Sequence, residues 1–469
     1  MSHDTSLPTA PPLAPPALSA RAKLTLLVLC TAQFVVTLDF SILNVALPAL
    51  GDDLGMGQAD LQWAVTAFAL PSGGLLLLAG RLADRHGRRR LFLLGLAVFT
   101  VASVLVTLAW DPASFLAGRA LQGVGAALIV PTGMALLTTT FPEGPQRERA
   151  LGISGTLLSL GYTTGMVLGG VMTDGLGWRS TMGLLAAAGA AVLAVAPGAL
   201  TEPRGTDDAT ARRRPVDLPG AVTVTGGLLA VIYALSTAAQ RGFGRADVIA
   251  ALAVGALLLT AFVIVESRVA DPLVSLPMLR RPTVAFGNLG GLATVSTMTA
   301  LIFLLTLYLQ EVLKLSAFRT GMLFGVQGVF AALAGLTASR VIGRLGAHRT
   351  LVTGLLLQAV ATAPLLRLGS GPDAAWWALA GASAGVVGNL WAVVAYGVTA
   401  TSGVPAASQG LATGLVTSSQ QLGTTVGIPL LSAVGSAWGL RTAFGVDAVV
   451  VGAAAVVVAV GLRGARRAP

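Results

Sequence analysis

Apolar residues in this chain come in long blocks separated by short polar segments, as in residues 91–109 and 248–265. The blocks are about 20 residues long and lack the alternation of a membrane β-strand, which indicates helices that cross a bilayer. In hydrocarbon every backbone N–H and C=O needs a partner within its own segment, and a helix supplies one. Fourteen spans are expected, at residues 24–48, 60–80, 91–110, 113–140, 150–173, 180–200, 217–239, 247–266, 284–310, 320–342, 350–368, 374–400, 409–438 and 443–462.

The segments between the spans predict the orientation of the chain. Most of the 30 Lys and Arg residues fall on the side of the predicted membrane that carries the N-terminus. Cytoplasmic loops of membrane proteins hold the excess of Lys and Arg. An even number of spans then places both ends in the cytoplasm, as a disordered tail at 1–22 and a short tail at 463–469. A multi-pass protein of the bacterial inner (plasma) membrane is expected.

Two short patterns recur at nearly the same distance along the chain. The sequence Gly80-Arg81-Leu82 returns at Gly343-Arg344-Leu345, and 343 − 80 = 263. The pair Gly161-x3-Gly165 returns as Gly423-x3-Gly427, and 423 − 161 = 262. The repeat predicts a six-helix bundle at 23–200, two inserted helices with their loops at 201–283, and a second six-helix bundle at 284–462. Transporters commonly bind substrate between such repeated halves.

Composition excludes several classes of function. With 54% hydrophobic and 11% charged residues, the chain cannot cover a soluble surface. The net charge of +10 therefore indicates lipid and membrane sidedness rather than nucleic acid. The lone Cys30 and the scattered His3, His86 and His348 form no metal or catalytic constellation, and no lysine motif for ATP is present. No enzyme activity, cofactor or metal is expected, and the chain is expected to be a monomer.

Asp39 and Arg119 are the strongly charged residues expected deep within the spans. A bare charge at that depth costs at least about 2.5–3.5 kcal/mol, so intramembrane ionisable residues are functional by default. The two lie at a similar depth in the first and fourth spans. Protonation of Asp39 could therefore be coupled to its contact with Arg119. A permanent structural ion pair is the alternative.

The segment from Gly80 to Arg90 contains the pattern G-x-x-x-D-R-x-G-R-R. This pattern resembles the signature of the major facilitator superfamily, whose fold is two pseudo-symmetric helical bundles. Four further segments resemble motifs of its fourteen-helix drug:proton antiporters: Leu38–Pro48, Arg119–Ala127, Asp271-Pro272-Leu273 and Tyr308-Leu309-Gln310. The resemblance implies that Asp39 is a proton and cation site, whereas the coupling role of Arg119 is inferred from its depth. It also implies that a cytoplasmic gating motif latches the two halves, formed by Gly80, Asp84, Arg85, Gly87, Arg88 and Arg89; a solvated basic loop is the alternative.

The fifth span carries small residues at four-residue spacing. The antiporter motif of the family has the same glycines followed by a proline, but here the proline position is Met166. The missing proline removes an expected kink and weakens the indication of antiport. Close helix packing is the alternative role for these glycines, since small residues let helices approach. The residues concerned are Gly152, Gly161, Gly165, Gly169 and Gly170.

Together these features favour proton-coupled export of a small amphipathic compound, neutral or monocationic, such as an antibiotic. Transport would proceed by alternating access, with about one proton per substrate from one intramembrane carboxylate. The partners are then a small-molecule substrate, protons and membrane lipid. A facilitator or a proton-coupled uptake carrier for a nutrient or metabolite is the second hypothesis, favoured by Met166. The sequence does not name the substrate.

Overall fold

The computed structural model describes residues 19–141, 145–201, 217–242, 244–269, 276–371, 373–404 and 409–465, with only the backbone at a few helical positions such as Asp84. These residues are helical almost throughout. The predicted tails and the motif Asp271-Pro272-Leu273 lie wholly or largely outside this part of the chain. The long helices are α1 (Ala20–Leu54), α2 (Gln58–Gly74), α4 (Arg88–Thr107), α5 (Pro112–Thr140), α6 (Pro145–Leu176), α7 (Trp178–Ala199), α9 (Leu218–Arg241), α10 (Ala246–Glu266), α12 (Pro282–Leu307), α13 (Ala317–Leu345), α14 (Ala347–Thr362), α15 (Ala374–Thr401), α16 (Gln409–Trp438) and α17 (Leu440–Ala465).

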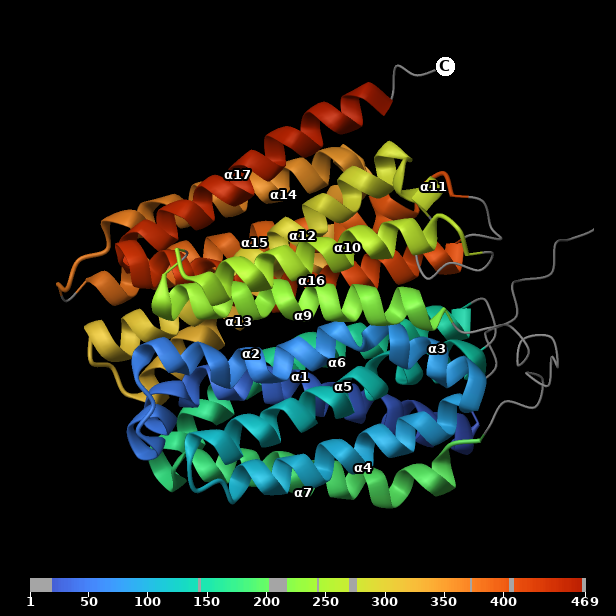
Figure 1. Cartoon of the computed structure of the whole chain (residues 1–469), viewed down its shortest axis with the longest axis horizontal. Helices are drawn as coiled ribbons and strands as arrows, with labels where there is room; N and C mark the ends of the chain where they lie inside the picture. The colour runs from blue at the N-terminus through green and yellow to red at the C-terminus, as the bar shows by residue number, and fades with distance from the viewer. Residues whose placement is uncertain are drawn as a thin grey trace, which may run out of the picture.

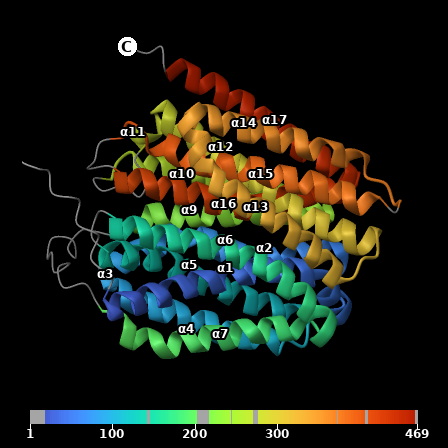
Figure 2. The same cartoon turned by 180° about the vertical axis from the view of Figure 1, so that it is seen from behind.

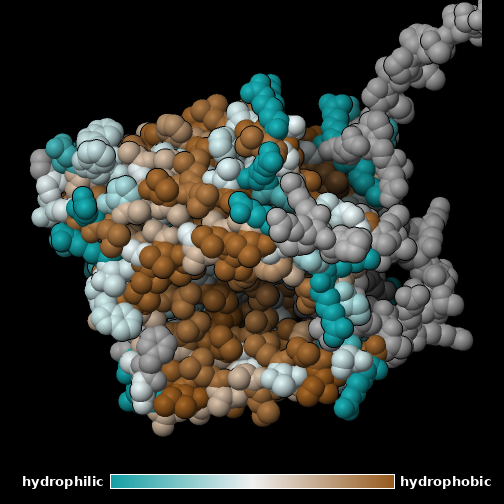
Figure 3. Space-filling model, turned by 90° about the horizontal axis from the view of Figure 1, so that it is seen from above, coloured by the Kyte–Doolittle hydropathy of each residue, from teal (hydrophilic) through white to brown (hydrophobic). Residues whose placement is uncertain are grey.

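Twelve helices in the described part of the chain are long and apolar enough to cross a membrane. Figure 3 shows the matching surface, a broad apolar belt with hydrophilic residues gathered at its two ends. Two of the long helices lie outside this twelve: α2, which is 17 residues long, and α16, whose sequence is rich in Ser, Thr and Gln. A multi-pass helical membrane protein is therefore confirmed, and the count of fourteen spans stays a prediction.

The second predicted span, 60–80, is two helices. The helix α2 ends at Gly74, and α3 (Leu76–His86) begins after Leu75. Pro71 lies within the last turn of α2, where its ring removes a backbone donor from the helix. The same α3 corrects another expectation, because the basic segment from Gly80 to Arg90 is not a loop. It runs as helix to His86, turns at Gly87 alone and continues as α4.

The helices form two groups with a hairpin beside them. Helices α1–α7 lie together, and α12–α17 form the other group (Figures 1 and 2). The antiparallel pair α9–α10 lies against both, since α9 contacts α2 and α16. Its side-chain bonds to the first group are specific: Gln62 Nε2 donates to the Ser236 carbonyl at 2.7 Å, and Thr225 Oγ1 donates to the Gly74 carbonyl at 2.6 Å.

The two groups repeat one packing motif. Ser41 Oγ on α1 donates to the Gly161 carbonyl on α6 at 3.4 Å. In the other group Ser296 Oγ on α12 donates to the Gly423 carbonyl on α16 at 3.0 Å. A side chain at Gly161 or Gly423 would meet the backbone of the facing helix. The internal repeat seen in the sequence thus corresponds to equivalent close helix contacts.

Candidate functional site

Asp39 and Arg119 form an ion pair in the interior of the first group of helices. Arg119 Nη1 on α5 donates to Asp39 Oδ1 at 2.7 Å and to Asp39 Oδ2 at 2.8 Å on α1. Both side chains are 0% exposed. Breaking such a buried pair by removing one partner costs about 3–5 kcal/mol, because the other charge stays uncompensated. The structure therefore brings together the two charged residues singled out in the sequence.

Neutral groups complete the surroundings of the guanidinium. Arg119 Nε donates to the Ala64 carbonyl of α2 at 3.1 Å, and Arg119 Nη1 also reaches Gln122 Oε1 at 2.7 Å. Gln122 Nε2 in turn donates to Ser103 Oγ at 2.9 Å. Arg119 Nη2 has no partner among the described residues. Nη1 thus donates to three acceptors, whereas Nη2 donates to none. The N–H groups of Nη2 are therefore available to a new acceptor if Arg119 moves.

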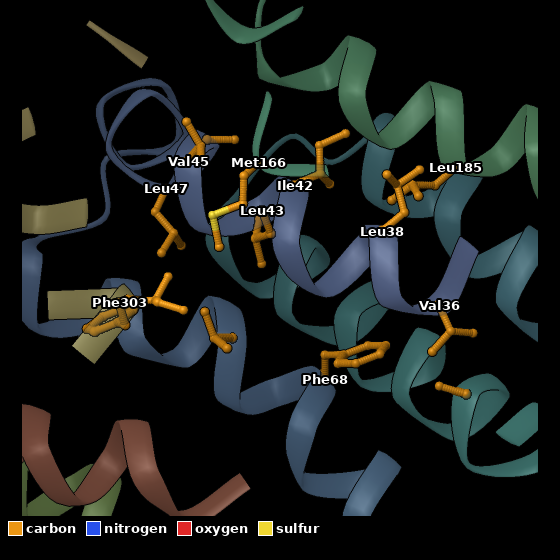
Figure 4. Packing of buried hydrophobic residues seen from close by; sticks show 14 of the residues in the cluster. Val36, Leu38, Ile42, Leu43, Val45, Leu47, Phe68, Met166, Leu185 and Phe303 are labelled. Atoms are coloured by element: carbon orange, nitrogen blue, oxygen red, sulfur yellow. The ribbon is translucent and has the colours of Figure 1, made fainter. Parts of the chain in front are cut away.

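Phe68 of α2 lies next to the ion pair. The Cζ atom of Arg119 is 4.6 Å from the centre of the Phe68 ring, the distance of a cation–π contact. Gly123 makes this approach possible, because a side chain there would overlap the Phe68 carbonyl and Pro71. Figure 4 shows Phe68 of α2 and Val36 of α1 among the buried side chains of this region.

A cavity of about 460 Å³ lies between the two groups of helices, and Phe68 is part of its wall. Asp39 and Arg119 do not line it. The wall comes from α1, α2, α5 and α6 on one side and from α12, α13, α15 and α16 on the other. Its side chains are apolar or uncharged: Gln33, Val36, Thr37, Phe40, Phe68, Ala69, Ser72, Val130, Met134, Leu158, Tyr162, Thr163, Met166, Val295, Met298, Thr299, Ile302, Phe324, Gln327, Gly328, Ala331, Val386, Asn389, Leu390, Val393, Thr417, Gln420, Thr424 and Thr425.

Uncharged hydrogen-bonding groups line both sides of this cavity. The Gln327 amide on α13 is 4% exposed and makes no hydrogen bond within the described part of the chain. Asn389 on α15 donates through Nδ2 to Thr294, which leaves its carbonyl oxygen for another donor. Tyr162 on α6 lines the same space. Such a wall suits a molecule with an apolar body and a few polar groups.

The glycines of α6 divide into two sets. Gly161, Gly165 and Gly169 lie against α1, where a side chain at Gly169 would be 2.8 Å from the Ile42 carbonyl. Gly170 faces α13 instead, 2.6 Å from the Ala317 carbonyl when a Cβ is added, whereas Gly152 has nothing within 4 Å. Close packing thus accounts for four of the five. The helix is continuous through Met166, which is 1% exposed.

The seam between α6 and α13, where the two groups of helices meet, differs between its two ends. At the Ala317 end, Phe318 N donates to Asp174 Oδ2 at 2.9 Å, and Gln310 Nε2 donates to the Val45 carbonyl at 2.9 Å. Gly321 lies against the Met166 carbonyl in the same region. Toward the other end, a side chain added at Gly155 of α6 or at Gly335 of α13 would meet nothing within 4 Å among the described residues. The contacts across the seam are therefore concentrated at its Ala317 end.

The predicted gating motif, on α3 and the start of α4, lies at the end of the molecule opposite the start of α13 (Figure 1). Gly87 has a φ of 99°, a conformation that suits glycine, and it separates α3 from α4. Arg89 Nη2 donates to the Pro197 carbonyl of α7 at 2.9 Å, a contact within the first group of helices. Arg85 is exposed, Arg88 has a partner, and a side chain at Gly80 would meet nothing within 4 Å. The side chain of Asp84 is outside the described part, so its pairing stays a prediction.

One intramembrane acid was missed in the sequence. Asp447 of α17 is 0% exposed, and neither carboxylate oxygen has a partner among the described residues. The span expected at 443–462 put it close to an interface. The helix begins earlier, at Leu440, which places Asp447 about two turns inside. The signal that could have found it was an acid followed by an uninterrupted apolar run.

Comparison with known proteins agrees with this architecture. The sequence profile of the Major Facilitator Superfamily matches residues 29–405 and 287–469. The cephamycin export protein CmcT of Amycolatopsis lactamdurans is 39% identical over 430 residues, covering 89% of this chain and 85% of that protein. The puromycin resistance protein pur8 of Streptomyces alboniger is 38% identical over 415 residues, covering 87% and 81% respectively.

Solved structures show the same fold at low sequence identity. The in meso crystal structure of the POT family transporter PepTSo superposes with a TM-score of 0.72 at 15% identity, covering 97% of this chain and 100% of that one. The human organic anion transporter MFSD10 has a TM-score of 0.62 at 18% identity, with coverage of 93% and 99%. Fold, profile and relatives agree, and the chain belongs to the major facilitator superfamily.

Proposed function

We propose that this protein is a proton-coupled exporter of a small, amphipathic, uncharged compound such as an antibiotic. The observation that carries the proposal is the position of the buried pair Asp39–Arg119 directly behind Phe68, which lines the central cavity. A proton site and a substrate site so arranged can sense each other. The names of the relatives, which are export and resistance proteins, support export as the direction of transport.

The wall of the cavity supports the substrate class. Its described residues include no Asp, Glu, Lys, Arg or His, so a charged substrate would lose its hydration without gaining a counter-ion. An uncharged molecule avoids this cost, and Gln327 and Tyr162 supply hydrogen bonds to its polar groups. Of the neutral and monocationic compounds expected from the sequence, the neutral ones fit this wall better.

Proton exchange at Asp39 supplies the coupling. Protonation removes the negative charge that holds Arg119, and the guanidinium then turns toward other acceptors with its unused Nη2 donor. Because Phe68 is stacked on the guanidinium, movement of Arg119 changes the cavity wall. Substrate binding acts on the ion pair through the same contact. Substrate and proton therefore compete, as antiport requires.

The described conformation is one state of an alternating-access cycle. We interpret the contact between Asp174 and Phe318 as a closed outer end. The opposite end, where Lys and Arg are concentrated, then faces the cytoplasm and is the open one. We assign residues 23–200 and 284–462 to two six-helix bundles and 201–283 to the inserted pair, with α2–α3 and α16 completing fourteen crossings. Asp84 and its arginines then meet the second bundle when the cytoplasmic end closes.

Energetically, one proton suffices for a useful gradient. A membrane potential on the order of 150 mV is worth about 3.5 kcal/mol per charge. This corresponds to a gradient of a few hundred-fold for a neutral substrate.

A resistance panel in an efflux-deficient bacterial host tests the proposal. Expression of the chain should raise the inhibitory concentration of at least one uncharged antibiotic, and a protonophore should abolish the effect. Asp39→Asn should remove it at unchanged expression, whereas Asp373→Asn, an exposed acid, should not. Resistance that persists with the protonophore contradicts proton coupling. Accumulation of a nutrient by the expressing cells, with no resistance to any compound, supports the alternative of an uptake carrier or facilitator.

A further inference from the structure

Asp447 is the buried acid that the pair Asp39–Arg119 leaves unexplained. It lies on α17, which is apolar enough to cross the membrane from Leu440 to Arg463. Its side chain is 0% exposed, and both carboxylate oxygens lack a hydrogen-bond partner in the described part of the chain. Asp39 is compensated by a guanidinium, whereas no described residue forms an ion pair with Asp447.

The elements around Asp447 offer no counter-ion. One turn before it, Phe444 makes an edge-to-face contact with Tyr308, at 6.4 Å between ring centres. One turn after it, Val451 belongs to an apolar cluster with Leu351 and Leu355 of α14. The helix α17 packs against α12, α14, α16 and the 3₁₀ helix η2 (Ala363–Arg367). The described charged or basic groups on these elements and on α17 are His348, Arg349, Arg367, Arg441 and Arg463, and none of them pairs with Asp447.

The internal repeat shows that the fold does not need an acid at this position. The pattern Gly177-x-Arg179-x3-Gly183 returns as Gly439-x-Arg441-x3-Gly445, again 262 positions later because 439 − 177 = 262. Gly177 and Gly439 have φ values of 81° and 86° and precede α7 and α17.

With this offset Asp447 corresponds to Leu185 of α7, since 447 − 185 = 262. Leu185 is also 0% exposed. An apolar side chain therefore fills the equivalent site in the first bundle. The carboxyl group at Asp447 is an addition to a position that packs well without it.

An ionised carboxylate at this site would be buried without compensation, and the neutral acid form avoids that cost. We propose that Asp447 is a second proton-binding site, occupied while the outer end of the molecule is closed. The proposal rests on the proposed proton-coupled transport. The proton enters from the outer water, is carried as the bundles rock, and leaves to the cytoplasm, so each cycle exchanges two protons for one substrate.

Infrared spectroscopy on the purified full-length chain in lipid tests the site, with the proton itself as probe. At pH 7 the wild type should show the C=O stretching band of a protonated carboxyl. Asp447→Asn should lose this band, whereas Asp39→Asn and the exposed control Asp373→Asn should keep it. If Asp447→Asn does not fold, Asp447→Leu is used in its place, because leucine is the residue at the equivalent position, Leu185, in the first bundle. Identical bands in the wild type and the Asp447 variant overturn the proposal.

Proteoliposomes test the second proton, using the compound selected by the resistance panel. With a pH difference of one unit and no membrane potential, the limiting gradient should be about 100-fold for two protons and about 10-fold for one. The wild type should approach the larger value and Asp447→Asn the smaller. Equal gradients in both overturn the exchange of a second proton. If the resistance panel finds no exported compound, the proposed function is contradicted instead. The infrared experiment still tests the protonation of Asp447, because it needs no transported compound.

Discussion

Replacing Phe68 by leucine should uncouple substrate binding from the proton site. The variant keeps an apolar wall but removes the ring that lies 4.6 Å from the Arg119 Cζ atom. A cation–π contact is worth about 2 kcal/mol when it is desolvated, and both residues here are buried. This corresponds to a factor of about 30 in an equilibrium constant.

Coupling free energies between two sites are typically about 1–3 kcal/mol, so loss of the Phe68 contact should remove most of the coupling. In the wild type, substrate should bind more weakly at low pH, where Asp39 is protonated, by about 5- to 150-fold. In Phe68→Leu this ratio should fall close to one. The measurement is the dissociation constant of the exported compound on purified protein at acidic and alkaline pH.

Phe324→Leu is the matched control. Phe324 also lines the cavity and is 4% exposed, but it lies on α13, in the other group of helices from the Asp39–Arg119 pair. It should weaken binding similarly at both pH values and preserve their ratio. If Phe68→Leu behaves in the same way as this control, Phe68 does not connect the two sites and the reasoning is refuted.

Three further variants test the packing, the recognition and the closed end. Gly165→Ala should lower the melting temperature, because the added Cβ would overlap Ser41 Oγ, and overpacking costs about 1–3 kcal/mol. Gly155→Ala is the control and should be neutral, because a Cβ there would meet nothing within 4 Å. Gln327→Leu should weaken substrate binding by about 2- to 13-fold, the worth of one hydrogen bond at about 0.5–1.5 kcal/mol, without changing its pH dependence; an unchanged affinity would exclude Gln327 from recognition. Asp174→Ala removes the acceptor of the Phe318 N–H. A cysteine introduced between α6 and α13 at the outer end should then react faster with a thiol reagent. An unchanged rate would show that this contact does not close the outer end.

The sequence predicted the helices well because each apolar block must satisfy its own backbone. The bounds of α15 and α16, Ala374–Thr401 and Gln409–Trp438, differ from the expected spans by at most one residue. The break at Leu75 was missed, since hydropathy continues across it and only Pro71 marks the change. The single-residue turn at Gly87 was missed because charge alone does not separate a basic loop from a basic helix.

The site was predicted in part. Charge in an apolar block identified Asp39 and Arg119, and their similar depth predicted that they meet. Phe68 could not be found, because an aromatic residue in an apolar helix carries no signal of its own and its role comes from the contact between α2 and α5. The cavity is likewise formed by uncharged residues from eight helices, which no local pattern brings together.

Proteoliposomes that contain Asp39→Asn give the most direct test of proton coupling. Two fluxes of the exported compound should be compared with those of the wild type: accumulation driven by an imposed pH gradient, and exchange between equal pools without a gradient. The variant should lose the accumulation and keep the exchange, because substrate still crosses while no proton competes with it at position 39. Accumulation equal to that of the wild type would contradict Asp39 as the coupling group.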